Sequence, residues 1–311
     1  MLKILWKKFL NLFRRLLGTE QILQQQQQLQ LLLQQQLIAL GNRQTYLFTD
    51  PEKVKTTTTY KRCAEIISLL SPMDVKGGKY VRVGKNHDGG YVMLDNFQKE
   101  NVDAAYSLGI GNDISWDETI ASRGIDVFMF DHTIDRLLKC HPKFHYFRTG
   151  VTGCHKGVNL KTLGELIVEN GHTTCKNLIM KMDVEGCEWD IFSEAASDVI
   201  SQFSQFVVEF HGLSPDVHDQ KYSSIVNVLK KINQTHQSIH VHGNYLGVPL
   251  WIGEFVLPLL LEVTYIRRAD VKDNLIVNTR QFPTEIDQPT FADWPDIYLG
   301  NFSDDGGFGR K

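Results

Sequence analysis

The sequence predicts an α/β protein with a mostly parallel β-sheet, helices on both faces of the sheet, and an N-terminal helical extension. Residues 104–131 alternate strand, glycine turn, helix and strand, which is the βαβ unit of parallel sheets. Short apolar runs at 144–147, 178–182, 205–210 and 238–241 are each followed by polar residues. Because parallel strands end at one edge of the sheet, we expect these polar residues to gather there. The chain has 311 residues, 42% of them hydrophobic and 22% charged, and is long enough to bury a sizeable core.

Four parts are expected along the chain. Residues 1–18 combine five Lys or Arg with large apolar side chains and contain no acid, which favours an amphipathic helix lying on an anionic membrane surface. Docking of this helix on its own domain or on a partner is the alternative. Residues 19–44 are rich in Gln and Leu and predict a helix that serves as a spacer or joins two copies of the chain. Residues 45–59 are expected to form a linker, and residues 60–311 the globular domain.

Location follows from the same N-terminal region. Its uncharged runs are all too short to span a bilayer, and it lacks the apolar core and small-residue cleavage site of a signal peptide. We therefore expect a cytoplasmic protein that is attached peripherally to the membrane.

The βαβ unit predicts a cofactor that contains adenosine. Gly109 and Gly111 form a turn that lets backbone amides approach a ligand, and Asp131 follows the second strand, where an acid can accept hydrogen bonds from ribose hydroxyls. Ile114 occupies the place of the third glycine that a pyrophosphate requires, and Asn112 adds a nearby oxygen. The pattern favours S-adenosylmethionine over NAD, whereas the alternative is an ordinary strand-to-helix turn.

Residues 79–95 predict two short strands around Asp88, Gly89 and Gly90. One interpretation is a hairpin whose turn needs a pair of glycines. The other is that Asp88 and the glycine backbone border the amino-acid end of the cofactor. The sequence favours neither interpretation over the other.

Candidate catalytic residues follow three later strands. Asp183 stands directly after the run 178–182, and the alternation of side chains along a strand places Glu209 with His211, and His240 with His242, on common faces. Histidine and carboxylate side chains act as general bases and as metal ligands. We therefore expect catalysis by Asp183, His211 and His242, with Asp183, Glu209 and His211 as the ligands if a divalent metal is bound.

Several segments carry a family resemblance. The segment LIMKMDVEGCEWDIF, residues 178–192, resembles the K-I-D-V-E-G-x-E segment of FkbM-type S-adenosylmethionine-dependent methyltransferases. The segments VRVGKNHDGGYVML, YSLGIGNDISWDETIA and FMFDHT are similar to glycan-associated and methyltransferase-like branches of that family. Met182 and Cys187 depart mildly from the family pattern. The resemblance implies cofactor contacts for Gly109, Gly111 and Asp131, and a place at the reaction centre for Asp183.

The resemblance also implies a fold and an activity. The fold is a Rossmann-like, seven-stranded methyltransferase sheet closed by an antiparallel strand, and the activity is O-methylation. A cytoplasmic, membrane-associated member of the family would act on a sugar or glycan-precursor hydroxyl in surface-polysaccharide biosynthesis. Two alternatives stay open, an NAD-dependent oxidoreductase on the same sheet and a non-catalytic scaffold at the membrane.

Other features limit the partners and the compartment. A net charge of −3 and a pI near 6.4 give no field for binding nucleic acid. The five cysteines are an odd number without a CxxC pair, so we expect a reducing compartment and neither a zinc site nor a cysteine nucleophile. Residues 255–267 predict a β-hairpin broken at Pro258, and residues 283–311 are expected to run over the surface.

Overall fold

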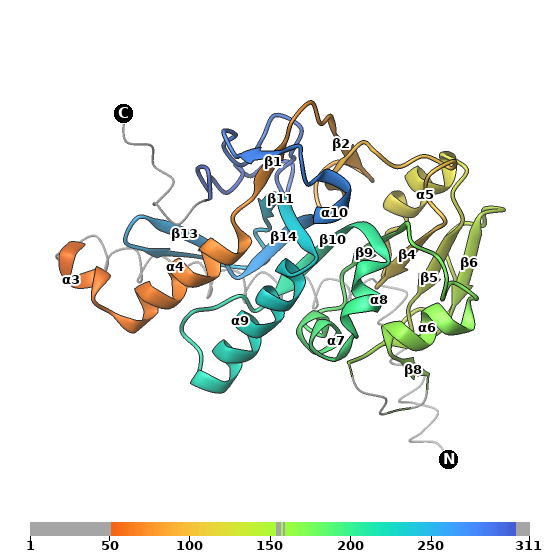
Figure 1. Cartoon of the computed structure of the whole chain (residues 1–311), viewed down its shortest axis with the longest axis horizontal. Coiled ribbons are helices and arrows are strands. Elements are labelled where there is room, and N and C mark those ends of the chain that lie inside the picture. Colours follow the sequence, from red (N-terminus) through yellow and green to blue (C-terminus); the bar gives the residue numbers. More distant parts are fainter. Residues whose placement is uncertain (1–50, 154–156, 158, 303–311) are drawn as a thin grey trace, which may run out of the picture.

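A seven-stranded sheet forms the centre of the molecule (Figure 1). The computed structural model describes residues 51–153, 157 and 159–302. The strands, in sheet order, are β11 (His236–Gly243), β14 (Leu260–Arg267), β10 (Phe203–His211), β9 (Leu178–Met182), β4 (Ala104–Leu108), β5 (Val127–Phe130) and β6 (Phe144–Phe147). The α/β class is confirmed, and the strands expected at 104–108, 127–130, 144–147 and 178–182 have those bounds.

The sheet is mixed, with four parallel and two antiparallel pairings between its seven strands. Strands β10, β9, β4, β5 and β6 pair in parallel, whereas β14 lies between β10 and β11 and is antiparallel to both. Leu260, the first residue of β14, stands opposite His211, the last residue of β10. The chain therefore enters β14 at the edge where the parallel strands end, and the strand must run back against them.

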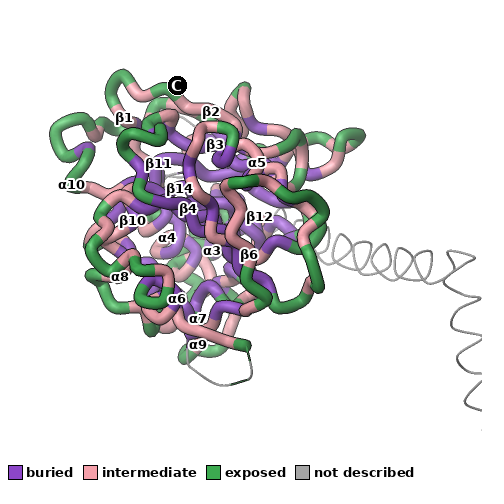
Figure 2. Tube along the Cα trace, turned by 90° about the vertical axis from the view of Figure 1, so that its right-hand side faces the viewer, coloured by how far each residue is buried: buried purple, intermediate pink, exposed green. Residues whose placement is uncertain are grey.

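Each face of the sheet is covered by its own layer (Figures 1 and 2). On one face the larger core packs against α4 (Thr58–Leu70), α6 (Leu163–Glu169), α7 (Glu188–Glu194), α8 (Ser197–Ser201) and α9 (Asp219–Asn233). On the other face a second core contains residues of α5 (Ser115–Ser122) and of the hairpin formed by β2 (Tyr80–Val83) and β3 (Tyr91–Leu94). Side chains alternate along β4, so that Tyr106 packs in the first core and Ala105 in the second.

Short pairs of strands and two short helices complete the fold. They are β1 (Met73–Val75) with β15 (Leu275–Val277), β7 (Gly150–Val151) with β8 (Leu160–Lys161), β12 (Pro249–Ile252) with β13 (Phe255–Pro258), and the helices α3 (Pro51–Lys55) and α10 (Arg268–Val271). The hairpin predicted over 255–267 is wrong. β13 pairs with β12, which precedes it in the chain, and β14 joins the main sheet. The antiparallel strand expected in this region is β14.

The two ends of the described chain are more structured than the sequence suggested. Residues 51–59, placed in the linker by sequence, form α3 and the start of α4, and Val54 is buried. The C-terminal segment 284–302 does not simply run over the surface, since Asp287, Thr290 and Leu299 are all buried in it. The expectations for residues 1–18, 19–44 and 45–50 lie outside the described residues. Within the described part of the chain, no helix has both the length and the apolar character to cross a bilayer.

Candidate functional site

A cavity of about 410 Å³ opens where β4, β5 and β9 end. It is lined by residues from three places: the glycine turn after β4, the tips of β5 and β9, and the β2–β3 loop. Six of the seven expected cofactor contacts line it, namely Asp88, Gly89, Gly109, Gly111, Asn112 and Asp131. Gly90 does not, because it packs against the loop, where an added Cβ would lie 2.0 Å from the carbonyl oxygen of Lys85. The hairpin and the site interpretations of this loop are therefore compatible.

The glycine turn is fixed by close backbone packing. Gly109 has φ +77°, and a Cβ at this position would lie 1.7 Å from the carbonyl oxygen of Asp183. No other residue fits there, since both the backbone conformation and the space exclude a side chain. The buried Lys181 also donates from Nζ to the carbonyl oxygen of Gly109 at 2.6 Å. The turn after β4 is thus tied to the end of β9, and the two sides of the cavity form one unit.

Asp131 shapes the turn as well as facing the cavity. Its Oδ2 accepts from the backbone N–H groups of Ile110 and Gly111, both at 2.9 Å. Its Oδ1 accepts from the backbone N–H of Thr133 at 2.7 Å and from the hydroxyl of Thr133 at 2.6 Å. Partial burial disfavours the charged form, but these hydrogen bonds outweigh it and lower the pKa of Asp131. A fixed carboxylate therefore stands at the tip of β5.

Ile114 closes the start of α5. It is the N-cap residue of that helix, is buried, and packs within the second core with Trp116 and Ile120. The helix N-terminus therefore lacks the open glycine approach that a pyrophosphate needs above it.

Asp183 lines the cavity, and His211, which is not among the lining residues, lies beside Asp183. Asp183 continues the ladder between β4 and β9, since its N–H donates to the carbonyl of Leu108 at 2.9 Å. The His211 Nε2 atom lies 3.9 Å from Asp183 Oδ1 and 3.4 Å from Glu185 Oε2. Burial raises the pKa of Asp183. Burial lowers the pKa of His211, but the neighbouring carboxylates, with Glu188 first, outweigh it and raise that pKa.

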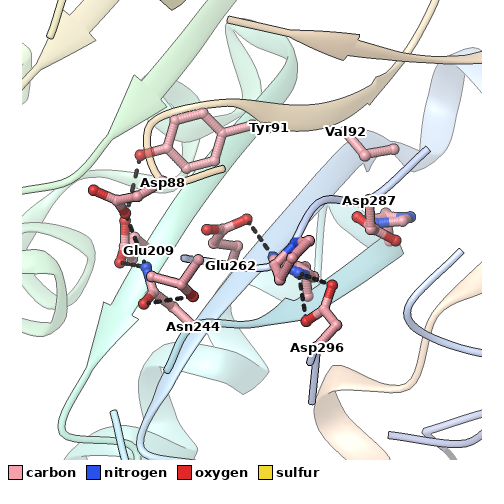
Figure 3. A network of polar contacts seen from close by, with 12 residues as sticks. Asp88, Tyr91, Val92, Glu209, Asn244, Glu262, Asp287 and Asp296 are labelled. Atoms are coloured by element: carbon pink, nitrogen blue, oxygen red, sulfur yellow. Dashed lines mark hydrogen bonds and ion pairs between the residues drawn. The ribbon is translucent and has the colours of Figure 1, made fainter. Parts of the chain in front are cut away.

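Glu209 lies behind this pair and is buried. Its carboxylate accepts from Tyr91 Oη at 3.3 Å and from Asn244 Nδ2 at 3.0 Å (Figure 3). Burial, reinforced by the carboxylates of Asp183 and Glu262, raises the pKa of Glu209 well above its ordinary value. The ligating atoms of Asp183, Glu209 and His211 lie within 4.8 Å of one another. The three side chains expected to hold a metal are thus close together, and their oxygen and imidazole atoms suit a divalent ion.

His242 is not part of this group. Its Nδ1 lies 3.0 Å from Glu262 Oε2 and its Nε2 3.0 Å from Asp296 Oδ2 (Figure 3). Burial disfavours the charged ring, but the two carboxylates raise the pKa of His242 well above its ordinary value. Both ring nitrogens are thus engaged by carboxylates, and His242 is not among the residues that line the cavity. The expectation that it joins Asp183 and His211 is corrected.

Comparison with known proteins decides the family. The model of the FkbM methyltransferase domain matches residues 72–236, just over half of the chain. The chain belongs to the FkbM methyltransferase family. Comparison with curated proteins gave no match. Among solved structures, the chain is similar to a putative hemolysin from Streptococcus thermophilus, at 9% identity over 66% of this chain and 75% of that one, with a TM-score of 0.30.

The FkbM match covers the candidate site residues at the ends of β4, β5, β9 and β10, and it leaves His242 and its partners outside. It includes the glycine turn, Asp131, Asp183 and the Glu209–His211 pair, and it ends at the first residue of β11. Its end also leaves out β14 and the C-terminal segment 284–302, which supply the partners of His242.

Four residues that contact the candidate site residues were missed by sequence reasoning: Tyr91, Lys181, Glu188 and Asn244. A lysine inside the apolar run of β9 was a visible signal, because buried lysines need a partner. Glu188 stands at the start of a helix, where acids are common as caps and dipole partners, so its position alone gives no signal of a role in the site. Nothing local distinguishes Tyr91 or Asn244, since their partner Glu209 lies 118 and 35 residues away along the chain.

Proposed function

We propose that this FkbM methyltransferase transfers a methyl group from S-adenosylmethionine to a hydroxyl oxygen of a sugar or glycan precursor. One observation carries the proposal. The same cavity is lined by the glycine turn with Asp131 and by Asp183 at the tip of β9, with His211 beside it. A nucleoside-binding region and a group of potential bases therefore face a common space.

The chemistry of the cavity supports S-adenosylmethionine rather than NAD. Ile114 blocks the approach that a pyrophosphate needs, whereas carboxylates and Asn112 suit the ammonium and sulfonium centres. Asp131 would take the ribose hydroxyls, and the backbone of Gly109 and Gly111 would lie beside the adenosine. The bound cofactor supplies an electrophilic methyl group.

The acceptor hydroxyl must lose a proton as its oxygen forms the new bond to carbon. A sugar hydroxyl is a poor nucleophile at neutral pH, so a base near the cavity is needed. His211 is the better placed, because its Nε2 points toward Asp183 and Glu185 while its Nδ1 is engaged on the other side. Asp183 would orient the hydroxyl and stabilise the protonated ring.

A divalent ion is the second candidate for drawing off this proton. Asp183, Glu209 and His211 would hold it, and the ion would supply positive charge that lowers the pKa of a bound hydroxyl. Burial favours the protonated form of Glu209, so its carboxyl group would have to lose that proton when the ion binds. If a chelator abolishes turnover and one added metal restores it, deprotonation with the help of a metal ion would be favoured over deprotonation by His211 alone.

The charges around the cavity support an acceptor that is uncharged near the reacting atom. Of the described lysines that line it, Lys85 pairs with Asp113 at 3.2 Å and Lys181 is bonded to the carbonyl of Gly109. Neither is left to bind a phosphate, while Asp88, Asp183 and Glu185 add negative charge. A hydroxyl on a neutral sugar unit fits these walls better than a diphosphate does.

Binding measurements test the cofactor. S-adenosylmethionine should raise the melting temperature and NAD should not. Asp131→Ala should weaken S-adenosylmethionine binding by about 10- to 150-fold, which corresponds to the ~1.5–3 kcal/mol of a hydrogen bond to a charged group. Stabilisation by NAD alone would instead favour the oxidoreductase.

Mass spectrometry tests the acceptor. Neutral glycans, glycan precursors and nucleotide sugars would be incubated with the protein and S-adenosylmethionine, and products that have gained one CH₂ would be sought. Turnover of a hydroxyl acceptor supports the proposal. Methylation only of a nitrogen or carboxylate would overturn the O-methyl assignment, and no turnover with any acceptor would favour the scaffold.

The proposed location is the cytoplasmic face of a membrane, with attachment through residues 1–18 and self-association through residues 19–43. The basic and apolar composition of the first segment supports attachment. Deleting residues 1–18 should move the protein to the soluble fraction and leave S-adenosylmethionine binding unchanged. High salt should weaken attachment of the intact protein, because part of the attraction is electrostatic and is screened.

A further inference from the structure

Glu188 is a fully buried carboxylate at the first position of α7. One of its oxygens, Oε1, gathers three partners: the backbone N–H of Val184 at 3.1 Å, the backbone N–H of Gly186 at 3.1 Å, and His211 Nδ1 at 3.0 Å. The other oxygen, Oε2, has no hydrogen-bond partner among the described residues. A single oxygen atom therefore joins the loop after β9 to the ring at the end of β10.

The next residue of α7 holds the other side of His211. Trp189 donates from Nε1 to the carbonyl oxygen of His211 at 2.7 Å, and its ring stacks on Phe210 at a centroid distance of 4.6 Å. Both the side chain and the backbone of His211 are thus held by consecutive residues of one helix. The loop itself is bent tightly, with φ +56° at Glu185 and φ +103° at Gly186. The hydrogen bonds to Glu188 favour that bend.

These contacts determine which nitrogen of His211 carries the proton. Nδ1 faces two acceptors, Glu188 Oε1 at 3.0 Å and the carbonyl oxygen of Glu209 at 3.1 Å. Neither acceptor can donate: one atom is a carbonyl oxygen, and the other already accepts two N–H groups, so Nδ1 must be the donor. In the neutral ring the lone pair is then on Nε2. That atom is the one directed toward Asp183 and Glu185.

We propose that Glu188 is a positioning residue that holds His211 in the Nδ1–H tautomer and presents its Nε2 lone pair to the acceptor hydroxyl. This inference rests on the proposed function, since it assigns Nε2 of His211 as the atom that receives the hydroxyl proton. As the hydroxyl oxygen bonds to the methyl carbon, the carbon–sulfur bond breaks toward sulfur, and the hydroxyl proton moves to Nε2. Glu188 itself exchanges no proton. Its role is to hold the ring of His211 and the loop after β9, residues 183–187 (the acidic loop), in a fixed arrangement.

The proposal distinguishes two substitutions at this position. In Glu188→Gln the amide oxygen can replace Oε1 and keep all three hydrogen bonds, while the amide nitrogen takes the place of Oε2, which has no partner to lose. In Glu188→Ala all three bonds are lost. We expect Glu188→Gln to keep kcat within about tenfold of the wild type, and Glu188→Ala to lower kcat by about 10²–10⁴-fold, as expected when a base is left in the wrong tautomer or orientation. The KM for S-adenosylmethionine should change little in both.

Nitrogen-15 NMR of the histidine rings gives a readout that is independent of activity. At a pH where the ring is neutral, His211 of the wild type and of Glu188→Gln should show the Nδ1–H tautomer, and Glu188→Ala should show a mixture. The signal is assigned with His211→Gln. Glu194→Gln, at the exposed end of the same helix, is the matched control and should leave both the tautomer and kcat unchanged.

Each outcome separates the inference from the proposed function. A wild-type ring in the Nε2–H tautomer overturns the inference, and so does Glu188→Ala with an unchanged tautomer and unchanged kcat. Loss of kcat in Glu188→Gln with the tautomer preserved also overturns it, because charge rather than position would then matter. If Glu188→Ala does not fold, the wild-type tautomer and Glu188→Gln still decide. The expected tautomers without turnover of any hydroxyl acceptor would uphold the positioning of His211 by Glu188 and reject the proposed function, together with the transfer of a hydroxyl proton to Nε2.

Discussion

Two strands of the sheet, β10 and β11, carry histidines near their ends in similar patterns and very different surroundings. His211 closes β10, two residues after Glu209, and His242 lies near the end of β11, two residues after His240. The Nε2 atom of His211 faces Asp183 and Glu185, whereas the two nitrogens of His242 are bound by the carboxylates of Glu262 and Asp296. The carboxylate oxygens beside Nε2 of His211 lie at 3.4 Å and 3.9 Å, whereas those beside the two ring nitrogens of His242 lie at 3.0 Å.

The difference comes from what covers each strand end. The C-terminal segment 284–302 supplies Asp287 to His240 and Asp296 to His242 (Figure 3). Above β10 the loop after β9 bends away at Gly186 and leaves Asp183 lining the cavity. The surroundings of a strand-end histidine therefore depend on the segment packed on it, and the pattern within the strand does not decide them.

The strongest test of this comparison is activity. His211→Gln and Asp183→Asn should each lower kcat for the methylated acceptor by about 10²–10⁴-fold, the usual contribution of a general base. S-adenosylmethionine binding should stay within a few-fold, since neither residue belongs to the proposed adenosine region. Steady-state kinetics with the acceptor from the mass-spectrometric screen checks both. If both variants keep full activity, the assignment of Asp183 and His211 fails.

The reciprocal test concerns stability. His242→Gln should lower the free energy of unfolding by about 3–5 kcal/mol, because the buried Glu262 and the partly buried Asp296 would lose their common partner. Activity per folded molecule should be retained. Urea denaturation measures the loss, with His211→Gln as the matched variant and an expected cost of about 1–2 kcal/mol for its hydrogen bonds. Equal costs in the two variants would contradict the distinction drawn between the two strands.

A third histidine on β11 sharpens the comparison through pH. His236 is buried at the start of the strand, and burial lowers its pKa to about 4, although its hydrogen bond to the carbonyl of Phe203 acts in the opposite direction. In the unfolded chain His236 binds a proton below about pH 6.5, whereas in the folded protein it does so only below about pH 4. Between these values the contribution of His236 to stability should fall with decreasing pH by on the order of 3 kcal/mol.

Denaturation at several pH values measures this effect. His236→Gln removes the titrating group, so the stability difference between wild type and variant should shrink as the pH falls from 7 to 4. His242→Gln should not produce this acid-side change, because the raised pKa of His242 means that its contribution is present below pH 6.5 and is lost only at higher pH. A difference between wild type and His236→Gln that is constant with pH would refute the assignment of a neutral, buried His236.

Sequence reasoning found the strands and failed where long-range packing decides. The runs that became β4, β5, β6 and β9 are short, apolar and bounded by polar residues, so each is defined by its own residues. The route of β14 is not, since a break near Pro258 looks the same whether the next strand turns back or enters another sheet. The polar tail was assigned to the surface because nothing in it shows that Asp287 has a buried histidine as a partner 47 residues earlier.

The same limit applies to the site. Gly109, Asp131 and Asp183 follow strands directly, and the order of strands in a parallel sheet brings such positions together. His211 could be placed with them because it closes the adjacent strand β10. His242 has an equivalent local pattern, and only the antiparallel insertion of β14 between β10 and β11 separates it from the cavity. The position of a strand in the sheet, rather than its own residues, decided this assignment.

The smallest expected effect lies at the acidic loop, where Glu185 and Glu188 contact the same ring from opposite sides. The side chain of Glu185 is 88% exposed and that of Glu188 is fully buried. Ion pairs on the surface contribute little, because water and salt screen them. Glu185→Gln should therefore change kcat by less than about fivefold, corresponding to the ~0–1 kcal/mol of a surface pair, and leave the melting temperature nearly unchanged. Kinetics at low and high salt check this. A loss of kcat as large as that of His211→Gln would mean that Glu185 itself contacts the acceptor, and that the loop after β9 closes over the cavity during turnover.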